Sequence, residues 1–335
     1  MRLLVTGGCG FLGVHFIERL LAQFPEAQVK VIDLRCPEDL PYSVQASGRV
    51  VIRTGRDICR LHSIENDFKD IDVVVHLAGL VSFALKDKAR LYEVNTSGSA
   101  NVAKLAKAAG VRKFVHISSV AALGYGDTHT PVNEDFDFDW SIARKYNKHY
   151  SLSKHFADAE IASILGEENV ITLYPGLMLG PGDFTNSPKL INSLALGKVP
   201  KNMPGGTNVV DARDVAQGIC DVLKKGISSG RFLLAGDNLT YEQINTQICK
   251  AVNVSAPAKT MSLSMEKPLY YLLLLAEKIM PNIPVTADNV HSAFKLRYFD
   301  NTKAVSELGW KRQYDFARTI TDTVKWMEEN GMLEG

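Results

Sequence analysis

Short apolar runs alternate with stretches of helical periodicity through the first half of the chain. Six of these runs are predicted strands: Leu3–Val5, Gln28–Asp33, Val50–Ile52, Ile71–Gly79, Lys113–Ser119 and Val170–Pro175. The fourth run is nearly continuously apolar, which is typical of a strand buried on both faces. Between the first two runs, apolar side chains recur at the spacing of one helix face. The alternation predicts an α/β fold, a doubly wound parallel sheet with a ligand crevice beyond the carboxyl ends of its strands.

A glycine-rich segment, Thr6–Gly13, joins the first predicted strand to the first predicted helix. Strand, glycine turn and helix are the context that a dinucleotide-binding fingerprint requires. Gly7 allows a tight turn, Gly10 lets the backbone approach a pyrophosphate, and Gly13 lets the helix pack close to the strand. The helix N-terminus adds amide donors and a positive partial charge. A turn between two core elements, with no ligand, is the alternative that this context disfavours.

An acidic residue, Asp33, ends the second predicted strand, 20 residues beyond Gly13. A carboxylate at this spacing binds the ribose hydroxyls of a dinucleotide. It also repels a 2′-phosphate, so the sequence favours NAD over NADP. Arg35 keeps NADP open, because a guanidinium two residues further on can pair with such a phosphate.

The regular pattern loosens beyond Gly176. Glycine- and proline-rich breakers at 180–182 and 204–206 flank a helical stretch, Pro188–Leu196. The tail is mostly helical and carries apolar residues on one face of its last helix. This second half therefore has the pattern of a lobe added to a parallel sheet.

Two later apolar segments, 209–211 and 231–235, are expected to be strands that return to the main sheet. We therefore expect an NAD-binding Rossmann domain over residues 1–176, with strands from about 207–236 returning to it. Residues 177–335 are expected to form mainly a smaller substrate-binding lobe.

The charge balance adds a restriction. The 335 residues include 38 Lys and Arg against 37 Asp and Glu, so the formal net charge is +1. This balance argues against a partner that is nucleic acid or an anionic membrane. The five cysteines are scattered and lack metal-ligand spacing, so we expect reduced thiols, no metal site and a cytoplasmic location. We also expect no signal peptide, because Met1 and Arg2 lead directly into the first strand.

Tyr150 and Lys154 are the sharpest catalytic candidates. Four residues apart on a predicted helix, their side chains share one face. A nearby cation lowers the pKa of a phenol, which makes Tyr150 a usable general acid and base. This spacing alone is weak, because a chain with 11 tyrosines is expected to contain such a pair by chance. Its weight comes from Ser119, 31 residues earlier, at the carboxyl end of a predicted strand.

Ser119 is expected to hydrogen-bond the substrate oxygen beside Tyr150. The alternative is a serine that satisfies backbone groups at the end of a strand. A Ser-His-Asp hydrolase is disfavoured, because Ser119 lacks the glycine-flanked strand–turn–helix elbow that such a nucleophile uses.

Ten segments follow one another in a characteristic order over nearly the whole chain: Thr6–Gly13, Asp33, Asp57–Ile58, Leu77–Gly79, Asn95, Ser118–Ser119, Tyr150–Lys154, Tyr174–Gly182, Val210–Ala216 and Lys303–Trp310. In these segments the chain resembles the extended short-chain dehydrogenases/reductases. The resemblance implies that Ser119, Tyr150 and Lys154 form a catalytic triad. It also implies that Lys154 holds the nicotinamide ribose and that Asn95 supports a proton-relay water.

The resemblance and the fingerprint together define the expected cofactor-binding residues: Gly7, Gly10, Phe11, Leu12, Gly13, Asp33, Arg35, Asp57, Ile58, Leu77, Ala78, Gly79, Tyr150, Lys154, Pro175 and Leu177. Relatives pair the helix that carries Tyr150 and the helix that carries Asn95 into a four-helix interface. A homodimer is therefore expected.

Within the superfamily the chain resembles most the group of 3β-hydroxysteroid dehydrogenases and dihydroflavonol reductases, on Gly205–Asp214 and Gly230–Gly236. Nucleotide-sugar epimerases usually place an arginine just before the corresponding Val-Asp run, where it binds a substrate phosphate. Thr207–Val210 contains no arginine. Sugar dehydratases carry an Asp-Glu pair after the catalytic hydroxyl residue. Val120–Ala121 stands there instead, so water elimination lacks its acid and base.

The most apolar segment, Leu269–Met280, is too short to span a bilayer and contains Glu277 and Lys278. A buried helix is the favoured interpretation. Consecutive leucines cannot all face one side of a helix, however, so some must meet another protein surface, a ligand or lipid. In the steroid dehydrogenases that the chain resembles, this region belongs to the substrate lobe. Contact with a membrane surface stays open.

The sequence thus leads to a hypothesis of an NAD-dependent oxidoreductase that interconverts a secondary alcohol and a ketone on an apolar, cyclic small-molecule substrate. Ser119 and Tyr150 would polarise the oxygen, Tyr150 would move the proton, and hydride would pass to or from nicotinamide C4. A nucleotide-sugar epimerase with tightly bound NAD is the first alternative. A non-catalytic NAD-binding regulator is the second.

Overall fold

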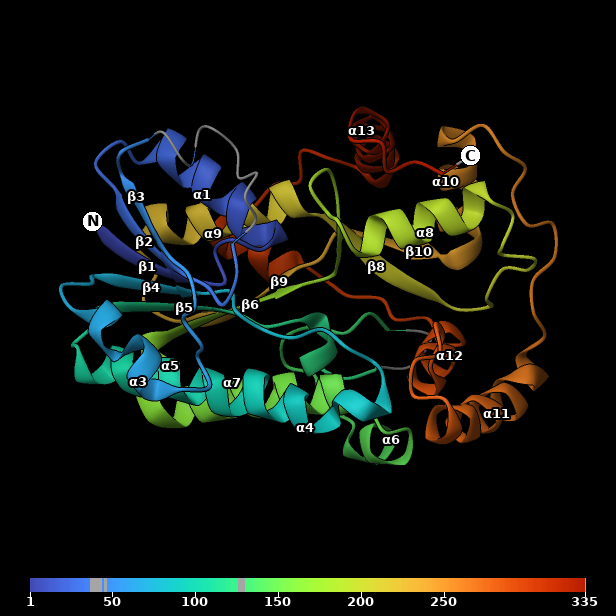
Figure 1. Ribbon diagram of the computed structural model, residues 1–335, viewed down its shortest axis with the longest axis horizontal. Helices are drawn as coiled ribbons and strands as arrows, with labels where there is room; N and C mark the ends of the chain where they lie inside the picture. Colours follow the sequence, from blue (N-terminus) through green and yellow to red (C-terminus); the bar gives the residue numbers. More distant parts are fainter. Residues whose placement is uncertain (37–43, 45–46, 126–129, 335) are drawn as a thin grey trace.

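A seven-stranded parallel sheet forms the larger half of the molecule (Figure 1). The computed structural model describes residues 1–36, 44, 47–125 and 130–334. The strand order is β3-β2-β1-β4-β5-β6-β9, and every neighbouring pair is parallel. In chain order the strands are β1 Arg2–Thr6, β2 Gln28–Ile32, β3 Val50–Arg53, β4 Val73–His76, β5 Lys113–Ile117, β6 Val170–Pro175 and β9 Gly230–Leu234. This is the doubly wound order, in which the chain reverses direction across the sheet between β1 and β4.

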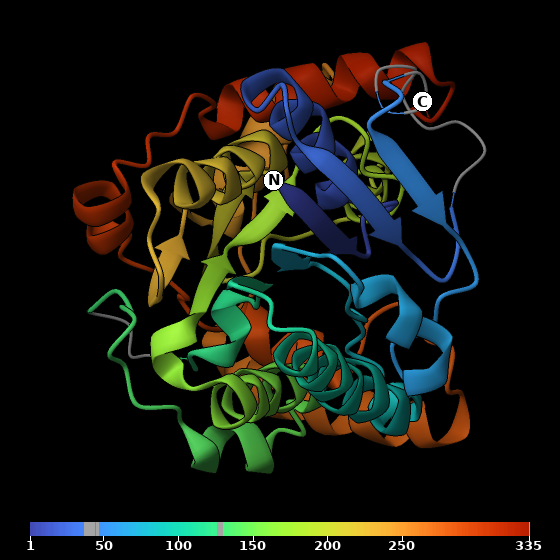
Figure 2. The same ribbon diagram turned by 90° about the vertical axis from the view of Figure 1, so that its left-hand side faces the viewer.

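Helices cover both faces of this sheet (Figures 1 and 2). On one face lie α1 (Phe11–Gln23) and α9 (Ala212–Lys225), and on the other lie α5 (Ser99–Ala108) and α7 (His149–Leu165). Each layer of helices closes its own apolar core against the sheet. The predicted α/β architecture is confirmed.

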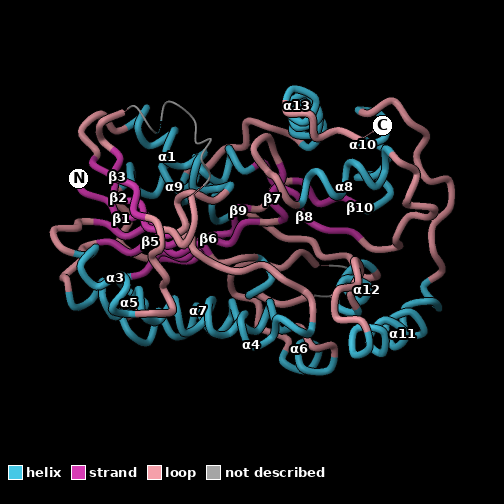
Figure 3. Tube along the Cα trace, in the orientation of Figure 1, coloured by secondary structure: helices cyan, strands magenta, loops and turns pink. Residues whose placement is uncertain are grey.

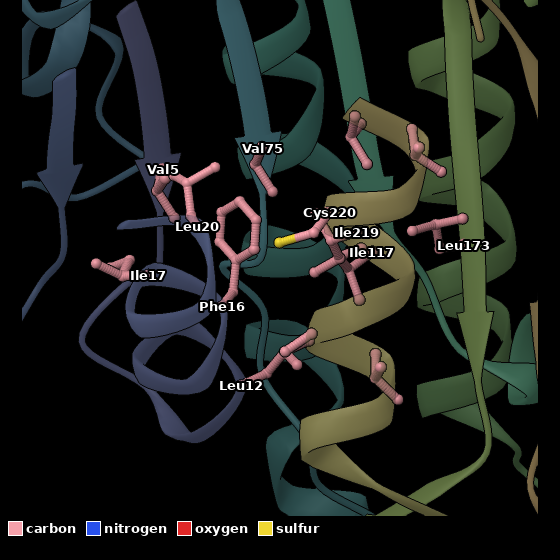
Figure 4. Close-up of a cluster of buried hydrophobic side chains, with 14 of the residues drawn as sticks. Val5, Leu12, Phe16, Ile17, Leu20, Val75, Ile117, Leu173, Ile219 and Cys220 are labelled. Atoms are coloured by element: carbon pink, nitrogen blue, oxygen red, sulfur yellow. The ribbon is translucent and has the colours of Figure 1, made fainter. Parts of the chain in front are cut away.

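The core on the α1 side shows why these sequences form these elements (Figure 4). Phe16 and Leu20 recur at helical spacing on α1 and face Ile219 and Cys220 of α9. All four side chains are 0% exposed. Strand residues such as Val75 close the cluster from the sheet side. Burial of such apolar surface is the main favourable term in folding.

A smaller sheet of three strands forms the rest of the molecule, in the order β10-β8-β7 (Figure 3). Its strands are β7 Leu177–Leu179, β8 Gly206–Asp211 and β10 Asp237–Thr240. β8 pairs in parallel with β7 and antiparallel with β10. Three helices, α8 (Asn186–Ala195), α10 (Tyr241–Ala251) and α13 (Phe316–Glu329), share its apolar core.

The expectation that residues 209–211 return to the main sheet is wrong. They belong to β8, which lies in the smaller sheet, whereas the segment around 231–235 contains β9, which pairs with β6. Every residue of β8 is buried. An apolar run signals that a strand is buried, but it does not say in which of two sheets.

Of the remaining described helices, α3 (Leu61–Ile64) packs in the same core as α5 (Figure 1). The others are α4 Lys88–Leu91, α6 Trp140–Lys145, α11 Glu266–Ile279 and α12 Ala287–Ala293. A π-helical turn, Tyr92–Gly98, joins α4 to α5, and a second one spans Ala304–Leu308. Short 3-10 turns occupy Glu65–Phe68, Leu85–Asp87, Val120–Ala122, Glu167–Asn169 and Leu263–Met265.

The interpretation of Leu269–Met280 as a buried helix is wrong. These residues form most of α11, and Leu272, Leu275 and Ile279 are 62%, 58% and 72% exposed. Only Tyr270 and Glu277 of this helix are buried. The apolar side chains are distributed around the helix axis, and the rest of the protein covers only the side that carries Tyr270 and Glu277. Within the described ranges, no helix is both long and apolar enough to cross a membrane.

Candidate active site

The glycine segment brings the ends of β1 and β4 into close contact. Gly7 has φ +70°, and a Cβ atom on it would lie 2.7 Å from the backbone N and Cα of Ala78. A Cβ on Gly13 would lie 2.5 Å from the carbonyl oxygen of Gly8. Both positions therefore require glycine, the first for a left-handed backbone and close approach, the second for helix packing. A tight turn at the first glycine and close packing of the helix on the strand at the last are the features that a dinucleotide fingerprint needs.

The first turn of α1 follows directly. Gly10 is its N-cap, and the helix starts at Phe11 with no side-chain cap. Backbone N–H groups at such a start lack partners within the helix. Leu12 packs its side chain into the core at 6% exposure, so only its main chain faces outward. A phosphate would therefore meet backbone donors here.

Asp33 stands beside this loop, just after β2. Its carboxylate accepts hydrogen bonds from the backbone N–H of Cys9 at 3.1 Å and of Arg35 at 3.2 Å. Burial raises the pKa of Asp33, and the bonds from Arg35, Cys9 and Leu34 oppose the rise. Arg35 itself is exposed. The structure thus places the acidic residue of the fingerprint against the glycine loop.

The other expected cofactor residues lie near the carboxyl ends of strands: Asp57, Ile58, Leu77, Ala78, Gly79, Pro175 and Leu177. Ala78 is held by its N–H, which donates to Thr6 Oγ1 at 3.3 Å. Asp57 accepts from the N–H of Cys59 at 3.0 Å, and Ile58 is buried. Gly79 and Leu177 are exposed. Because all strands of the main sheet are parallel, these segments meet at one edge.

Ser119, Tyr150, Lys154 and Asn95, here called the catalytic cluster, come together at the same edge. Tyr150 and Lys154 lie in the first two turns of α7 and are 9% and 6% exposed. Lys154 Nζ donates to the carbonyl oxygen of Ile117, the last residue of β5, at 2.9 Å. Ser119 contacts the phenol of Tyr150 and accepts a hydrogen bond from the Ala121 N–H at 3.2 Å. The structure therefore brings all four predicted catalytic residues together.

Asn95 lies in the π-helical turn and is 1% exposed. Its Oδ1 accepts from the Leu80 N–H at 2.7 Å, while Nδ2 donates to the Leu80 carbonyl and to Ser153 Oγ, both at 2.9 Å. Ser153 Oγ in turn donates to the carbonyl oxygen of Tyr150 at 2.8 Å. Asn95 thus fixes the segment after β4 against α7.

Burial controls the proton affinities of the cluster. Burial raises the pKa of Tyr150 above its ordinary value of 10.0, although contact with Ser119 and the charge of Arg297 oppose the rise. Burial lowers the pKa of Lys154 to about 8, against the attraction of Asp158. The expectation of a lowered Tyr150 pKa is therefore not met here. A phenol that loses its hydration holds its proton more tightly.

An aromatic side chain that the sequence did not single out lies against the catalytic tyrosine. The ring of Phe83 meets the ring of Tyr150 edge-on, with centroids 5.5 Å apart. Phe83 is 38% exposed and its neighbour Val81 58% exposed. The segment after β4 therefore presents apolar surface beside the phenol of Tyr150.

Lys148, directly before α7, is a second residue that the sequence did not reveal. It is fully buried, and its Nζ donates to Asp288 Oδ1 at 2.6 Å, to the Asp288 carbonyl at 2.9 Å and to Ser292 Oγ at 2.7 Å. Burial lowers the pKa of Lys148 to about 8, while Asp288 acts in the opposite direction. This ion pair ties the start of the catalytic helix to α12.

Glu277 links α11 to the segment after β4 and to the start of α12. Its Oε1 accepts from the Leu85 N–H at 3.0 Å and its Oε2 from the Ala287 N–H at 2.9 Å. Leu85 lies shortly after Phe83, and Ala287 begins α12. The signal for this role was present in the sequence, as an acidic residue inside an apolar run.

The fold and the catalytic cluster define an extended short-chain dehydrogenase/reductase, a class of NAD(P)-dependent oxidoreductases. Residues 4–212 match the 3-beta hydroxysteroid dehydrogenase/isomerase family, and the chain belongs to that family.

Curated relatives match over nearly the full length. Sterol demethylase protein B of Methylococcus capsulatus is 26% identical, over 99% of this chain and 100% of the relative. The decarboxylating sterol-4-alpha-carboxylate 3-dehydrogenase of Candida albicans is 26% identical over 98% and 97%. The UDP-glucose 4-epimerase of Dictyostelium discoideum is 25% identical over 98% and 96%.

Solved structures agree with the fold. The crystal structure of gox2253 superposes with a TM-score of 0.82 at 25% identity, over 99% of both chains. The dTDP-glucose 4,6-dehydratase DesIV of Streptomyces venezuelae, solved with NAD and TYD bound, gives a TM-score of 0.78 at 24% identity. It covers 100% of this chain and 99% of its own.

Replacing Gly7 by alanine should cost more stability than the same change at Gly110. Both glycines have positive φ, +70° and +67°, but a Cβ on Gly110 meets nothing within 4 Å. Each substitution strains the backbone by about 1–2 kcal/mol, and Gly7→Ala adds an overlap with Ala78 of about 1–3 kcal/mol. Urea unfolding without cofactor measures the difference. Equal losses in the two variants would show that the close approach to Ala78 is unimportant.

Replacing Lys148 by methionine should destabilise the protein strongly. The change leaves the Asp288 carboxylate buried without its cation, which costs about 3–5 kcal/mol. Lys325→Met is the matched control, because Lys325 forms an exposed pair with Glu329 at 3.9 Å. Its loss is expected to stay below about 1 kcal/mol. Similar unfolding midpoints for the two variants would contradict a structural role for the buried pair.

Proposed function

We propose that this protein is an NAD-dependent oxidoreductase that interconverts a secondary alcohol and a ketone on an apolar, cyclic substrate. The observation that carries the proposal is that Lys154 Nζ binds the carbonyl oxygen of Ile117, two residues before Ser119, with Tyr150 one helical turn away on the same helix. Tyrosine, serine and lysine in this arrangement can bind a substrate oxygen and move one proton to or from it.

The residues present fit a dinucleotide. Gly7 and Gly13 allow the close backbone approaches that this type of loop requires, and the start of α1 offers backbone donors for the pyrophosphate. Asp33 presents its carboxylate to the ribose side of that loop, which favours NAD over NADP. Arg35 is exposed and would have to swing toward a 2′-phosphate. Solved neighbours with NAD bound support the same choice.

Each catalytic residue then has a distinct role. The nicotinamide supplies or accepts the hydride when NAD is bound. The Ser119 hydroxyl holds the substrate oxygen, and the Tyr150 phenol donates a proton to it during ketone reduction or accepts one during alcohol oxidation. Lys154, charged and buried below the phenol, stabilises the tyrosinate that forms in oxidation. Asn95 keeps the segment after β4 in place beside this reaction.

Apolar surface beside the cluster supports an apolar substrate. Phe83 lies against Tyr150, and the exposed side chains of Val81 and Leu177 belong to segments that follow β4 and β6. Sterol dehydrogenases are among the relatives that match over nearly the full chain.

Nucleotide-sugar epimerisation is the second candidate, supported by the full-length match to a UDP-glucose 4-epimerase. An epimerase uses the same triad but returns the hydride to its substrate. Cofactor retained through purification, with no net NADH formed on UDP- or GDP-sugars, would favour this alternative. Dehydratase activity is not proposed, because Val120 and Ala121 supply neither acid nor base.

Tyr150→Phe should abolish turnover and leave NAD binding nearly unchanged. The change removes one hydroxyl from a buried ring, so the proton has no carrier while the glycine loop stays intact. NADH formation on a panel of 3β-hydroxysteroids and calorimetric NAD binding are the measurements. Tyr271→Phe, on the exposed side of α11, is the control and should behave as wild type. Unchanged turnover in Tyr150→Phe would overturn the assignment.

The two reaction directions should differ in their dependence on pH. The pKa of Tyr150 is raised above 10.0, so the phenol keeps its proton through the neutral range. Ketone reduction needs this acid form and should stay level between about pH 6 and 7.5, where Lys154, whose pKa is lowered to about 8, still carries its charge. Alcohol oxidation needs the base form and should rise with pH over the same range. Steady-state rates at saturating cofactor test this, and an oxidation rate that falls over that range would contradict it.

A further inference from the structure

Arg297 lies on a segment that is hydrogen-bonded to the start of β8 and to the loop at Val132. Its backbone N–H donates to the Gly206 carbonyl at 3.1 Å, and the Gly206 N–H donates to the Lys295 carbonyl at 2.9 Å. The next residue, Tyr298, accepts a hydrogen bond from the Val132 N–H at 2.9 Å. The position of Arg297 is therefore fixed by the backbone on both sides.

Two glycines make this close approach possible. A Cβ on Gly205 would lie 2.3 Å from the Lys295 carbonyl oxygen, and one on Gly206 would lie 2.5 Å from the Leu239 carbonyl oxygen. Residues 205 and 206 were part of the segment on which the family resemblance rested. Their role in the structure is to let the Arg297 segment pack against the start of β8.

The guanidinium of Arg297 lies over the ring of Tyr125, which a hydrogen bond links to the helix that carries Tyr150. Its Cζ is 5.1 Å from the centre of the Tyr125 ring. The Tyr125 hydroxyl is hydrogen-bonded to Ser151 Oγ at 2.7 Å, on the turn of α7 that carries Tyr150. The Arg297 charge is also close enough to lower the pKa of Tyr150.

Among the described residues, Arg297 has neither a carboxylate partner nor an acceptor for its Nε. Its Nε is buried and makes no hydrogen bond, and within the described ranges no carboxylate forms an ion pair with it. The neighbouring cations differ, because Lys148 pairs with Asp288 at 2.6 Å and Lys295 with Glu266 at 3.1 Å. A buried donor without an acceptor is costly. Arg297 is only partly exposed, and its described neighbours leave the buried Nε without an acceptor.

We propose that Arg297 binds an anionic group, a carboxylate or a phosphate, that the substrate carries near its reacting carbon. A guanidinium presents paired N–H donors that match both groups in a bidentate geometry. Arg297 is therefore a specificity-determining residue for the oxidoreductase proposed above, and this inference rests on that function. Nucleotide-sugar epimerases place their phosphate-binding arginine just before the Val-Asp run, and this chain has none there. Arg297 is a different arginine, about 90 residues later in the sequence.

Two kinds of substrate carry such a group. A cyclic secondary alcohol with a carboxylate on the adjacent carbon places the charge within a few bonds of the hydroxyl. A nucleotide sugar places a diphosphate on its sugar ring. Both satisfy the same guanidinium, so the experiment must separate them.

The test compares Arg297→Met with wild type on a matched pair of probes, a 3β-hydroxysterol with a 4α-carboxylate and its 4α-methyl ester. Loss of a charge-assisted hydrogen bond should lower the acid-to-ester ratio of kcat/KM about ten- to a hundredfold, mainly through KM. Arg297→Lys keeps the charge and should recover part of this ratio. Lys295→Met removes a paired cation from the same segment and should keep the wild-type ratio.

The phosphate arm uses UDP, added to the NAD-bound protein in a thermal-shift measurement. Stabilisation by UDP that disappears in Arg297→Met and persists in Lys295→Met identifies phosphate as the bound group. An acid-to-ester ratio that depends on Arg297 without any effect of UDP identifies a carboxylate.

Two results would overturn the inference. In the first, Arg297→Met changes neither the acid-to-ester ratio nor the UDP shift. In the second, the wild-type protein responds to neither anionic probe. Failure of the proposed function can be distinguished from failure of this inference. Oxidation of the ester by wild type with no preference for the acid would remove only the role of Arg297. Binding of UDP through Arg297 with no oxidation of either sterol would keep that role and reject the alcohol oxidoreductase.

Discussion

The parallel arrangement of the main sheet is the constraint on which the site depends. Seven parallel strands place all their carboxyl ends at one edge, so the loops that follow β1, β4, β5 and β6 must meet there. The contact between Gly7 and Ala78 is the tightest expression of this constraint, because no side chain fits between the two backbones. The glycine loop and Ser119 thus lie at the same edge of the sheet although more than a hundred residues separate them.

The sheet alone does not complete the site. Tyr150 stands on a helix whose start is tied to α12 by Lys148 and Asp288, and the segment beside it is tied to α11 by Glu277. The charge on Arg297, which lies on another C-terminal segment, influences the same phenol. Residues from the last fifth of the chain therefore contribute to the geometry and the proton affinity of a cluster that the first half supplies.

Local patterns explain what could be predicted from the sequence. The strands of the main sheet, the glycine loop and the four residues of the catalytic cluster follow from apolar periodicity, glycine spacing and a family resemblance. The assignment of residues 209–211 failed because burial does not identify a sheet, and the buried interpretation of α11 failed because an apolar run does not show which of its sides is covered. Lys148 and Arg297 were missed because their roles depend on contacts with residues far away in sequence, which no spacing rule records.

The buried pair of Lys148 and Asp288 also has a consequence for the order of assembly. The two residues are 140 positions apart, and a chain leaves the ribosome from its N-terminus. The main-sheet strands up to β6 can be complete while Asp288 has not yet been synthesised. During that interval the helix that carries Tyr150 begins with a cation whose counter-charge does not exist. The nascent protein can therefore build the sheet early, but the catalytic helix acquires its final anchor only when translation is nearly over.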